Sequence, residues 1–325
     1  MNHISVPRNA PLKAQESKAG SLIASSVVFL LVCVAVVTSR FYVRLRVIRN
    51  FGNDDTALAI TLFLTVATVA GVVYATRVGL GTHFETNTID NRRSFLKLLF
   101  CTSLGYHLCL MLLKATVLLQ YRRAFPLPRF QQICDIFLAF LAVWALGGLV
   151  GGAIICLPLS KNWDPLEPMW TCEKRTWFWI GHGIAHVVTD VLILIMPLPL
   201  LKTLPLPPVQ KAVLIGVFCL GFSTCVISAM RLTTLRPTLG TPDLTWTTVR
   251  TVLWSFGEVT CSIVCLCIPT LRPLAGSCFS RRLGADNITE RGPEQFRLHV
   301  PSTIGTSRPP SSIVPLTGAD TSSSR

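Results

Sequence analysis

Seven apolar stretches, each about as long as a bilayer is thick, limit what this chain can fold into. A helix that crosses the hydrocarbon core needs roughly 20 mostly apolar residues. The stretches that qualify are about 21–39, 56–76, 97–120, 133–157, 177–200, 212–232 and 250–272. Only 14% of the residues are charged and mean hydropathy is +0.54, whereas soluble domains carry about 25% charged residues. The sequence therefore predicts an all-α membrane protein, a bundle of seven transmembrane helices.

The rest of the chain is short and polar. Residues 1–20 form an arm before the membrane domain of 21–274, and residues 275–325 are rich in Ser, Thr and Pro, a composition typical of a disordered tail. The first apolar stretch lacks an Ala-x-Ala-like cleavage site and is followed by six more, which favours a retained helix over a signal peptide. The net charge of +14 indicates attraction to lipid headgroups and no nucleic-acid partner.

Charge counting leaves the orientation in the membrane nearly balanced. Each set of three alternate loops holds nine Lys and Arg residues, so the positive-inside rule does not separate the two orientations. The arginine-rich segment directly after the first stretch favours an outside N-terminus, because early helices weigh most. The C-terminal tail is then cytosolic, and the glycosylation sequon at Asn287 within it goes unused.

Ionisable residues interrupt three of the apolar stretches near the predicted bilayer midplane. His107 lies about ten residues into its span, or about 15 Å at 1.5 Å per residue, and His186 and Glu258 lie at similar depths. Asp190 is one turn deeper than His186. A charge at this depth is costly and should face the bundle interior and pair. The group is either a ligand or proton site, or a hydrogen-bonded lock between helices.

His182, His186 and Asp190 are spaced by four residues and therefore share one helix face. Two histidines at this spacing suit a metal ion, with His107 or Glu258 completing the ligands, but no motif such as His-Glu-x-x-His supports this, and we expect no metal. Lys114 either pairs with Asp190 or extends its amine to the headgroups.

Short motifs along the chain together resemble the fungal rhodopsin-domain (satratoxin-cluster-type) family of seven-transmembrane integral membrane proteins. They are "RFYVRLRV" followed by "NDDTALA", "GLGTH", "LLKATVLLQYRRAF", "CLPLSKNWDPLEPMWTC", "TDVLILIMPLPLLKTLPLPPVQK" and "WSFGEVTCSIVCLCIPTLRPL". The resemblance covers about residues 20–275. The residues that we expect to hold these motifs together are Arg44, Asp54, Asp55, Gly79, Gly81, His83, Tyr121, Arg123 and Arg231.

The resemblance implies an outside N-terminus and a disulfide between Cys156 and Cys172 of one outer loop, with Cys101 as the rival partner. The chain departs from the family at His186, where relatives typically have Asn. Retinal is not expected as a cofactor, because known pigments hold retinal on a lysine of the last helix and residues 250–272 contain none. No other cofactor is expected.

Two further motifs have simple structural interpretations. Asp54 and Asp55 open the second span, where acids cap free N–H groups and complement the helix dipole; they also suit pairing with the preceding arginines. "GGLVGGA" at 147–153 holds two Gly-x-x-x-Gly pairs, which allow helix backbones to approach closely.

The predicted function is that of a receptor-like sensor of a small molecule, located in the plasma membrane or an endomembrane. A cytosolic signalling partner is also considered, because "QYRRAF" is similar to an arginine motif of animal receptors, although it lacks that motif's acid. Positive-inside anchoring explains Arg122 and Arg123 equally well. The alternative is a membrane enzyme or accessory protein of a secondary-metabolite cluster, with the same polar groups as acid and base; enzymatic activity is left open.

Overall fold

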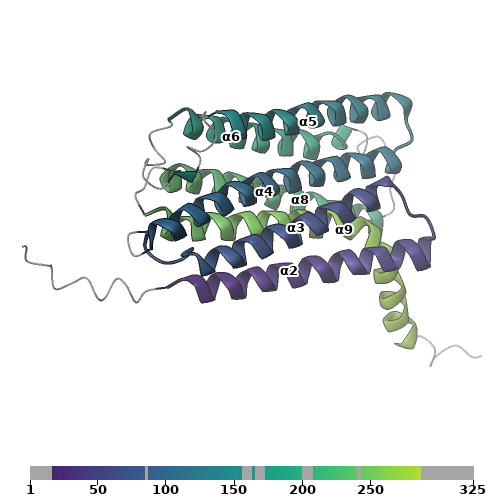
Figure 1. The fold of residues 1–325 in the computed structure, drawn as a ribbon. Coiled ribbons are helices and arrows are strands. Elements are labelled where there is room, and N and C mark those ends of the chain that lie inside the picture. The colour runs from purple at the N-terminus through teal and green to yellow at the C-terminus, as the bar shows by residue number, and fades with distance from the viewer. Residues whose placement is uncertain are drawn as a thin grey trace, which may run out of the picture. The chain divides into compact units, whose positions relative to one another are not determined.

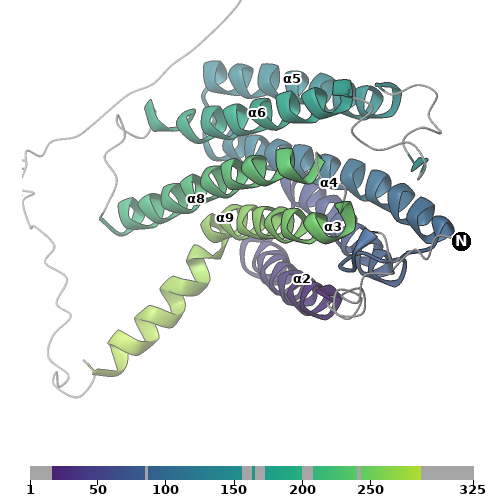
Figure 2. The same cartoon turned by 90° about the vertical axis from the view of Figure 1, so that its left-hand side faces the viewer.

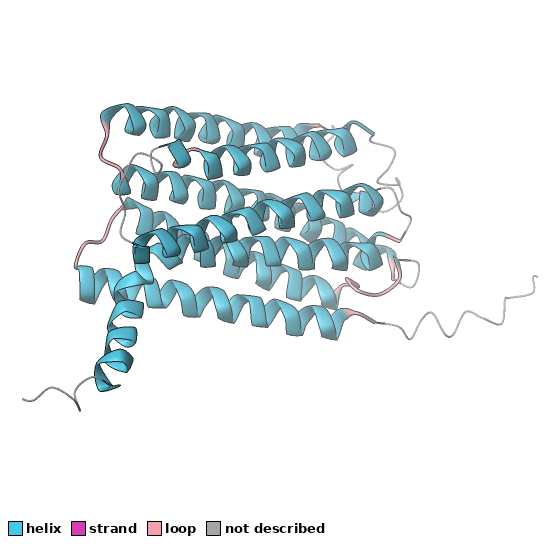
Figure 3. Cartoon of the chain, turned by 180° about the vertical axis from the view of Figure 1, so that it is seen from behind, coloured by secondary structure: helices cyan, strands magenta, loops and turns pink. Residues whose placement is uncertain are grey.

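The computed structural model describes residues 17–84, 87–155, 163–164, 173–199, 208–239 and 243–286. The elements within these ranges are α2 (Ala19–Tyr42), the π-helical η1 (Val43–Ile48), α3 (Asn53–Arg77), α4 (Ile89–Ala124), α5 (Pro128–Ile154), α6 (Glu173–Ile195), α8 (Pro208–Leu239) and α9 (Leu244–Asp286). All regular structure in these ranges is helical (Figure 3). Seven of the described helices are long and apolar enough to cross a membrane. The predicted all-α, seven-span architecture is confirmed.

Several helices extend beyond the predicted spans. α4 begins at Ile89 rather than near residue 97, because the Thr88 hydroxyl accepts a hydrogen bond from the Asn91 amide at 3.4 Å and caps the helix. α2 runs past residue 39, so Arg40, which the charge count placed in a loop, lies inside the helix. α9 continues to Asp286, past the predicted start of the tail at residue 275. The chain divides into two compact units, and the second begins at Phe279. The helical bundle belongs to the first unit.

α4 is the central helix of the bundle. It lies between the α5–α6 pair and the α2–α3 pair (Figures 1 and 2). Its apolar side chains enter three core clusters: Phe95 packs with α2, α3 and α9, Leu110 packs with a second set from the same helices, and Leu118 packs with α5 and α6. A polar residue on α4 can therefore meet partners from most of the other helices.

The Gly-Leu-Gly-x-His turn ties together one end of the bundle. Gly79 and Gly81 have φ values of 111° and 93°, a region that favours glycine. Gly81 donates to the Thr245 carbonyl at 3.2 Å and accepts from the Lys18 amide at 3.0 Å, so the turn joins the first residues of α2 and α9. His83 bonds Asp243 through Nδ1 and stacks on Trp246, with ring centroids 4.5 Å apart. The motif thus connects the starts of α2 and α9 at this end of the bundle.

Candidate functional site

Five ionisable residues from four helices meet inside the bundle, and we refer to them as the central cluster. They are Lys114 on α4, His186 and Asp190 on α6, Arg231 on α8 and Glu258 on α9. Lys114, His186 and Glu258 are almost fully buried, and Asp190 keeps 19% of its side-chain surface. Because the helices bury these groups away from water, each charge needs a partner within the protein.

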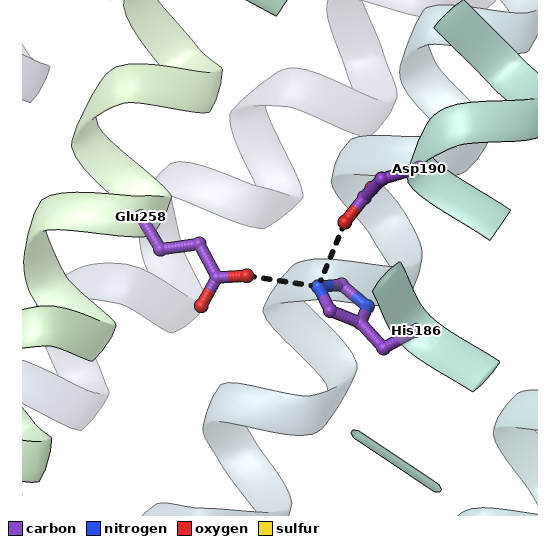
Figure 4. A group of neighbouring side chains, drawn as sticks. All are labelled: His186, Asp190 and Glu258. Carbon is purple, nitrogen blue, oxygen red and sulfur yellow. Dashed lines mark hydrogen bonds and ion pairs between the residues drawn. The ribbon is translucent and has the colours of Figure 1, made fainter. Parts of the chain in front are cut away.

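The cluster is a chain of alternating charges. Lys114 Nζ lies 2.9 Å from Asp190 Oδ1, and His186 Nε2 lies 3.2 Å from Asp190 Oδ2. His186 Nε2 also lies 2.9 Å from Glu258 Oε1, so the imidazole bridges the two carboxylates (Figure 4). Arg231 Nε completes the chain at 3.0 Å from Glu258 Oε2. The charges of Lys114 and Arg231 balance those of Asp190 and Glu258, and the His186 imidazole lies between the two carboxylates.

Neutral groups satisfy most of the remaining hydrogen-bonding capacity. The Tyr106 and Ser228 hydroxyls both donate to Glu258. Lys114 Nζ donates to the His186 carbonyl at 2.7 Å and to the Thr189 hydroxyl at 2.5 Å. His186 Nδ1, by contrast, is buried and has no hydrogen-bond partner in the described part of the chain. One imidazole nitrogen at the centre of the cluster is therefore unpaired, and Arg231 Nε, although 3.0 Å from Glu258, also makes no hydrogen bond of good geometry to a described residue.

A cavity of about 180 Å³ lies beside the central cluster. His186 and Arg231 line it together with Tyr106, Trp179 and Thr248, and most of its wall is apolar. An engineered apolar cavity of about 150 Å³ binds benzene, so a small organic molecule fits this space. Among the described residues that line the cavity, Arg231 is the only one with a permanent charge, and Glu258 neutralises it.

Two histidines form an upper layer of the site, one helical turn from His186. His182 Nε2 lies 3.2 Å from His107 Nδ1, and the His182 ring stacks on Trp144 with centroids 4.9 Å apart. Gly148 makes room for both rings, because an added Cβ would lie 2.5 Å from His107 Nε2. At this position the glycine motif accommodates side chains of α4 and α6, and the predicted close approach of helix backbones stays a prediction.

The structure confirms the predicted placement of the polar stripe on α6. His186 and Asp190 face the interior, Asp190 pairs with Lys114, and His182 lines the cavity. The sequence did not identify Arg231 as the partner of Glu258, although a lone arginine in an apolar span is itself a signal that a buried acid lies nearby.

The three ligand-type atoms of His186, Asp190 and Glu258 lie within 4.8 Å of one another. This spacing suits a metal ion, but Lys114 and Arg231 already neutralise both carboxylates. A divalent cation would add two charges to a cluster whose carboxylates already have cationic partners. The donor set fits an ion-pair network better than a metal centre.

A second ionic cluster, the arginine–aspartate cluster, lies at the end of the bundle opposite the Gly-Leu-Gly-x-His turn. Arg40 Nη2 lies 2.7 Å from Asp54 and Arg40 Nε lies 3.0 Å from Asp55, and all three side chains are buried. Arg44 and Arg123 also bind Asp54, at 3.1 and 2.8 Å. Asp55 accepts from the Gly52 amide as a helix cap. The predicted capping and arginine pairing are confirmed, and Arg123 finds its acid on α3 rather than beside it in sequence.

Other predicted residues play minor parts or lie outside the described ranges. Tyr121 packs partly buried against the α4–α5–α6 core. Cys156, Cys172 and Asn287 are not among the described residues, so the predicted disulfide and the unused sequon stay predictions. Cys101 is an exposed thiol on α4.

We expect Asp190→Ala to lower the folded yield, because it leaves Lys114 buried without its carboxylate, a loss of roughly 1–3 kcal/mol. His186→Asn introduces the residue that the family resemblance predicts at this position and is expected to fold normally, since Glu258 keeps Arg231, Tyr106 and Ser228. Fluorescence-detected gel filtration of detergent extracts measures both. Equal loss in the two variants would contradict the assigned importance of the Lys114–Asp190 pair.

Comparisons with known proteins identify a family and several relatives. The sequence profile described as the fungal rhodopsin domain matches residues 39–277. The polyenoic acids biosynthesis gene cluster protein Ba17b of Metarhizium anisopliae is 23% identical, over 76% of this chain and 71% of its own. Receptor GIN3 of Arthrobotrys oligospora is 23% identical over 83% of this chain and 63% of its own, and a SAT4 family membrane protein of Emericella nidulans is 25% identical over 61% and 51%. No solved structure matches significantly.

Proposed function

Since the chain belongs to the fungal rhodopsin domain family, a family of multi-pass membrane proteins, we propose that it is a receptor-like sensor that binds a small molecule in the cavity beside the central cluster. One observation carries this proposal: the cavity wall includes His186 and Arg231, and these belong to an ion-pair chain that joins α4, α6, α8 and α9. A ligand that rearranges this chain alters the packing of four helices at once. The similarity to receptor GIN3 supports this class of function.

The arginine–aspartate cluster gives the sensor a second point of control at the other end of the bundle. Arg123 at the end of α4 holds Asp54 at the start of α3, and α4 also carries Lys114 of the central cluster. A rigid helix that bears one residue of each cluster transmits a displacement between them, provided that both clusters have alternative arrangements. A cytosolic signalling partner would then contact the end that carries Arg123.

Filling the cavity tests the proposed function. Ser103 lines the cavity on α4, and Cys101 lies two residues away on the exposed surface of the same helix. We expect Ser103→Trp to occupy the space and to abolish rescue of the phenotype of a deletion strain, while Cys101→Trp rescues fully. Both variants should reach the membrane at normal levels, which immunoblotting checks. Full rescue by Ser103→Trp at normal levels would contradict a cavity-bound signal.

A pathway enzyme or accessory protein is the second candidate function. Ba17b and the fugralins biosynthesis cluster protein 2 of Gibberella zeae are both named for biosynthetic clusters. His186 lines the cavity and lies 2.9 Å from Glu258, a pairing suited to acid–base chemistry. Deletion of an enzyme causes its substrate to accumulate, whereas deletion of a sensor changes expression of a response without such accumulation. Metabolite profiling of the deletion strain therefore separates the two functions.

The orientation in the membrane is part of the proposal. We expect the N-terminus outside and the tail after residue 275 in the cytosol, so the cavity opens toward the outer half of the bundle. A reporter that functions only in the cytosol should be active when it is fused after Arg325. Glycosylation of Asn287 in the native chain would contradict this orientation. It would place the tail outside and the ligand entrance on the opposite side of the membrane.

A further inference from the structure

We infer that the ligand of this cavity is an uncharged, mainly apolar molecule with a hydroxyl group at the end that reaches His186. This inference rests on the proposed function and specifies the ligand class of the same site. It depends on three features of the cavity wall: the balance of charge, the free polar atoms and the apolar remainder.

The charge balance disfavours an ionic ligand. Arg231 is paired with Glu258 at 3.0 Å, and Lys114, behind the wall, is paired with Asp190 at 2.9 Å. His107 and His182 bond each other. A carboxylate or ammonium ligand would enter a low-dielectric space without a free counter-charge, which costs several kcal/mol. It would bind only by displacing an existing ion pair.

The free polar atoms indicate what a neutral ligand offers. His186 is 3% exposed and lines the cavity, and its Nδ1 has no described partner. Nε2 is occupied by the two carboxylates, so Nδ1 is the ring nitrogen left for a ligand, and a hydroxyl can act toward it as donor or as acceptor. A ligand hydroxyl bonds to it and satisfies an otherwise unpaired buried atom, and such satisfaction is favourable because an unpaired buried polar atom is costly.

A second free atom lies nearer the start of α9. Thr248 is also 3% exposed and lines the cavity, and its hydroxyl has no described partner. Thr248 precedes Glu258 by ten residues, or about 15 Å along the helix, so one ligand hydroxyl cannot serve both atoms. A ligand with a second polar group at its far end reaches Thr248 as well. Between the two levels the wall is mainly apolar, with Leu110, Val252 and Phe256 among its residues, and Ser255 adds a hydroxyl that already donates to the Thr251 carbonyl.

Three matched probes test the inference on the full-length protein in nanodiscs: hexan-1-ol, hexane-1,6-diol and hexanoate. Binding is measured by ligand-detected NMR. The signal that remains with the Ser103→Trp variant comes from probe dissolved in the lipid, so the difference between the two proteins gives binding in the cavity. We expect hexan-1-ol and the diol to bind at least about tenfold more tightly than hexanoate, given the cost of burying an unpaired charge.

Thr248→Val provides the matched variant, since it keeps the shape of the side chain and removes only the free hydroxyl. We expect it to weaken diol binding about threefold to tenfold, the effect of one hydrogen bond, and to leave hexan-1-ol within twofold. His186→Asn should weaken both neutral probes, because it removes Nδ1.

The outcomes are distinct. Cavity-dependent binding of hexanoate in preference to the neutral probes would overturn the ligand class and leave the proposed sensor intact. The ligand class would also be overturned if Ser103→Trp reduced the binding signal of neither neutral probe. The proposed function itself fails only if Ser103→Trp rescues the deletion strain.

Discussion

Replacing Arg40 with alanine is expected to destabilise the protein by about 3–5 kcal/mol, the usual cost of removing one partner from a buried ion pair. Arg40 is fully buried, as is Asp55, and Asp54 is 2% exposed. The guanidinium also donates to the Leu266 carbonyl at 2.8 Å and to Gln120 at 3.2 Å. Its loss leaves two buried carboxylates with only Arg44 and Arg123 nearby and frees a carbonyl on α9.

Thermal unfolding of the purified protein in detergent measures this effect. Arg46→Ala is the matched control, because Arg46 is an exposed arginine of η1 and a surface substitution usually changes stability by no more than about 0.5 kcal/mol. Arg40→Lys should recover only part of the loss, since an ammonium cannot bind two carboxylates with the planar geometry of a guanidinium. Similar midpoints for Arg40→Ala and Arg46→Ala would show that the arginine–aspartate cluster does not stabilise the fold.

Glu258→Gln is expected to have a comparable effect in the central cluster, about 3–5 kcal/mol. Glutamine keeps the size of the side chain and can still bond Ser228 and Tyr106, but it leaves the buried Arg231 without a counter-charge. The expected result is a large fall in folded yield and in the unfolding midpoint.

The double substitution Glu258→Gln with Arg231→Gln isolates the charge pair. Removing both charges should restore a large part of the stability lost by Glu258→Gln alone, because the unpaired cation is gone. If the double variant is as unstable as the sum of the two single variants, the Arg231–Glu258 pair contributes no coupling. The fold would then depend on each residue through its other contacts.

The sequence predicted the seven spans and the polar stripe well, because both depend on local patterns. Apolar length finds a span, and the four-residue spacing of His182, His186 and Asp190 places them on one face. Helix ends were less accurate: the predicted stretch ends at Ser39, one residue before Arg40, which is the only charged residue of α2 and is fully buried.

Partners across helices were harder to predict. Pairing with Asp190 was one of two alternatives for Lys114, suggested by the depth of that carboxylate. Arg231 and Glu258 are 27 positions apart on adjacent spans, and nothing local to either residue selects the other. The free atoms of His186 and Thr248, and the cavity between them, depend on how four helices pack. Such features follow from tertiary structure and have no signature in a single sequence.

The arginine–aspartate cluster also bears on how the chain is made. Arg40 and Asp54 are 14 residues apart, joined by η1 and a short turn, so they emerge from the ribosome almost together. A lone arginine at the end of the first helix resists entry into lipid, whereas an arginine already paired with the next helix does not. We therefore expect α2 and α3 to leave the translocon as one hairpin. The contacts of Arg40 with α4 and α9 would form only when these later helices arrive. The bond to the Leu266 carbonyl of α9 would therefore form last.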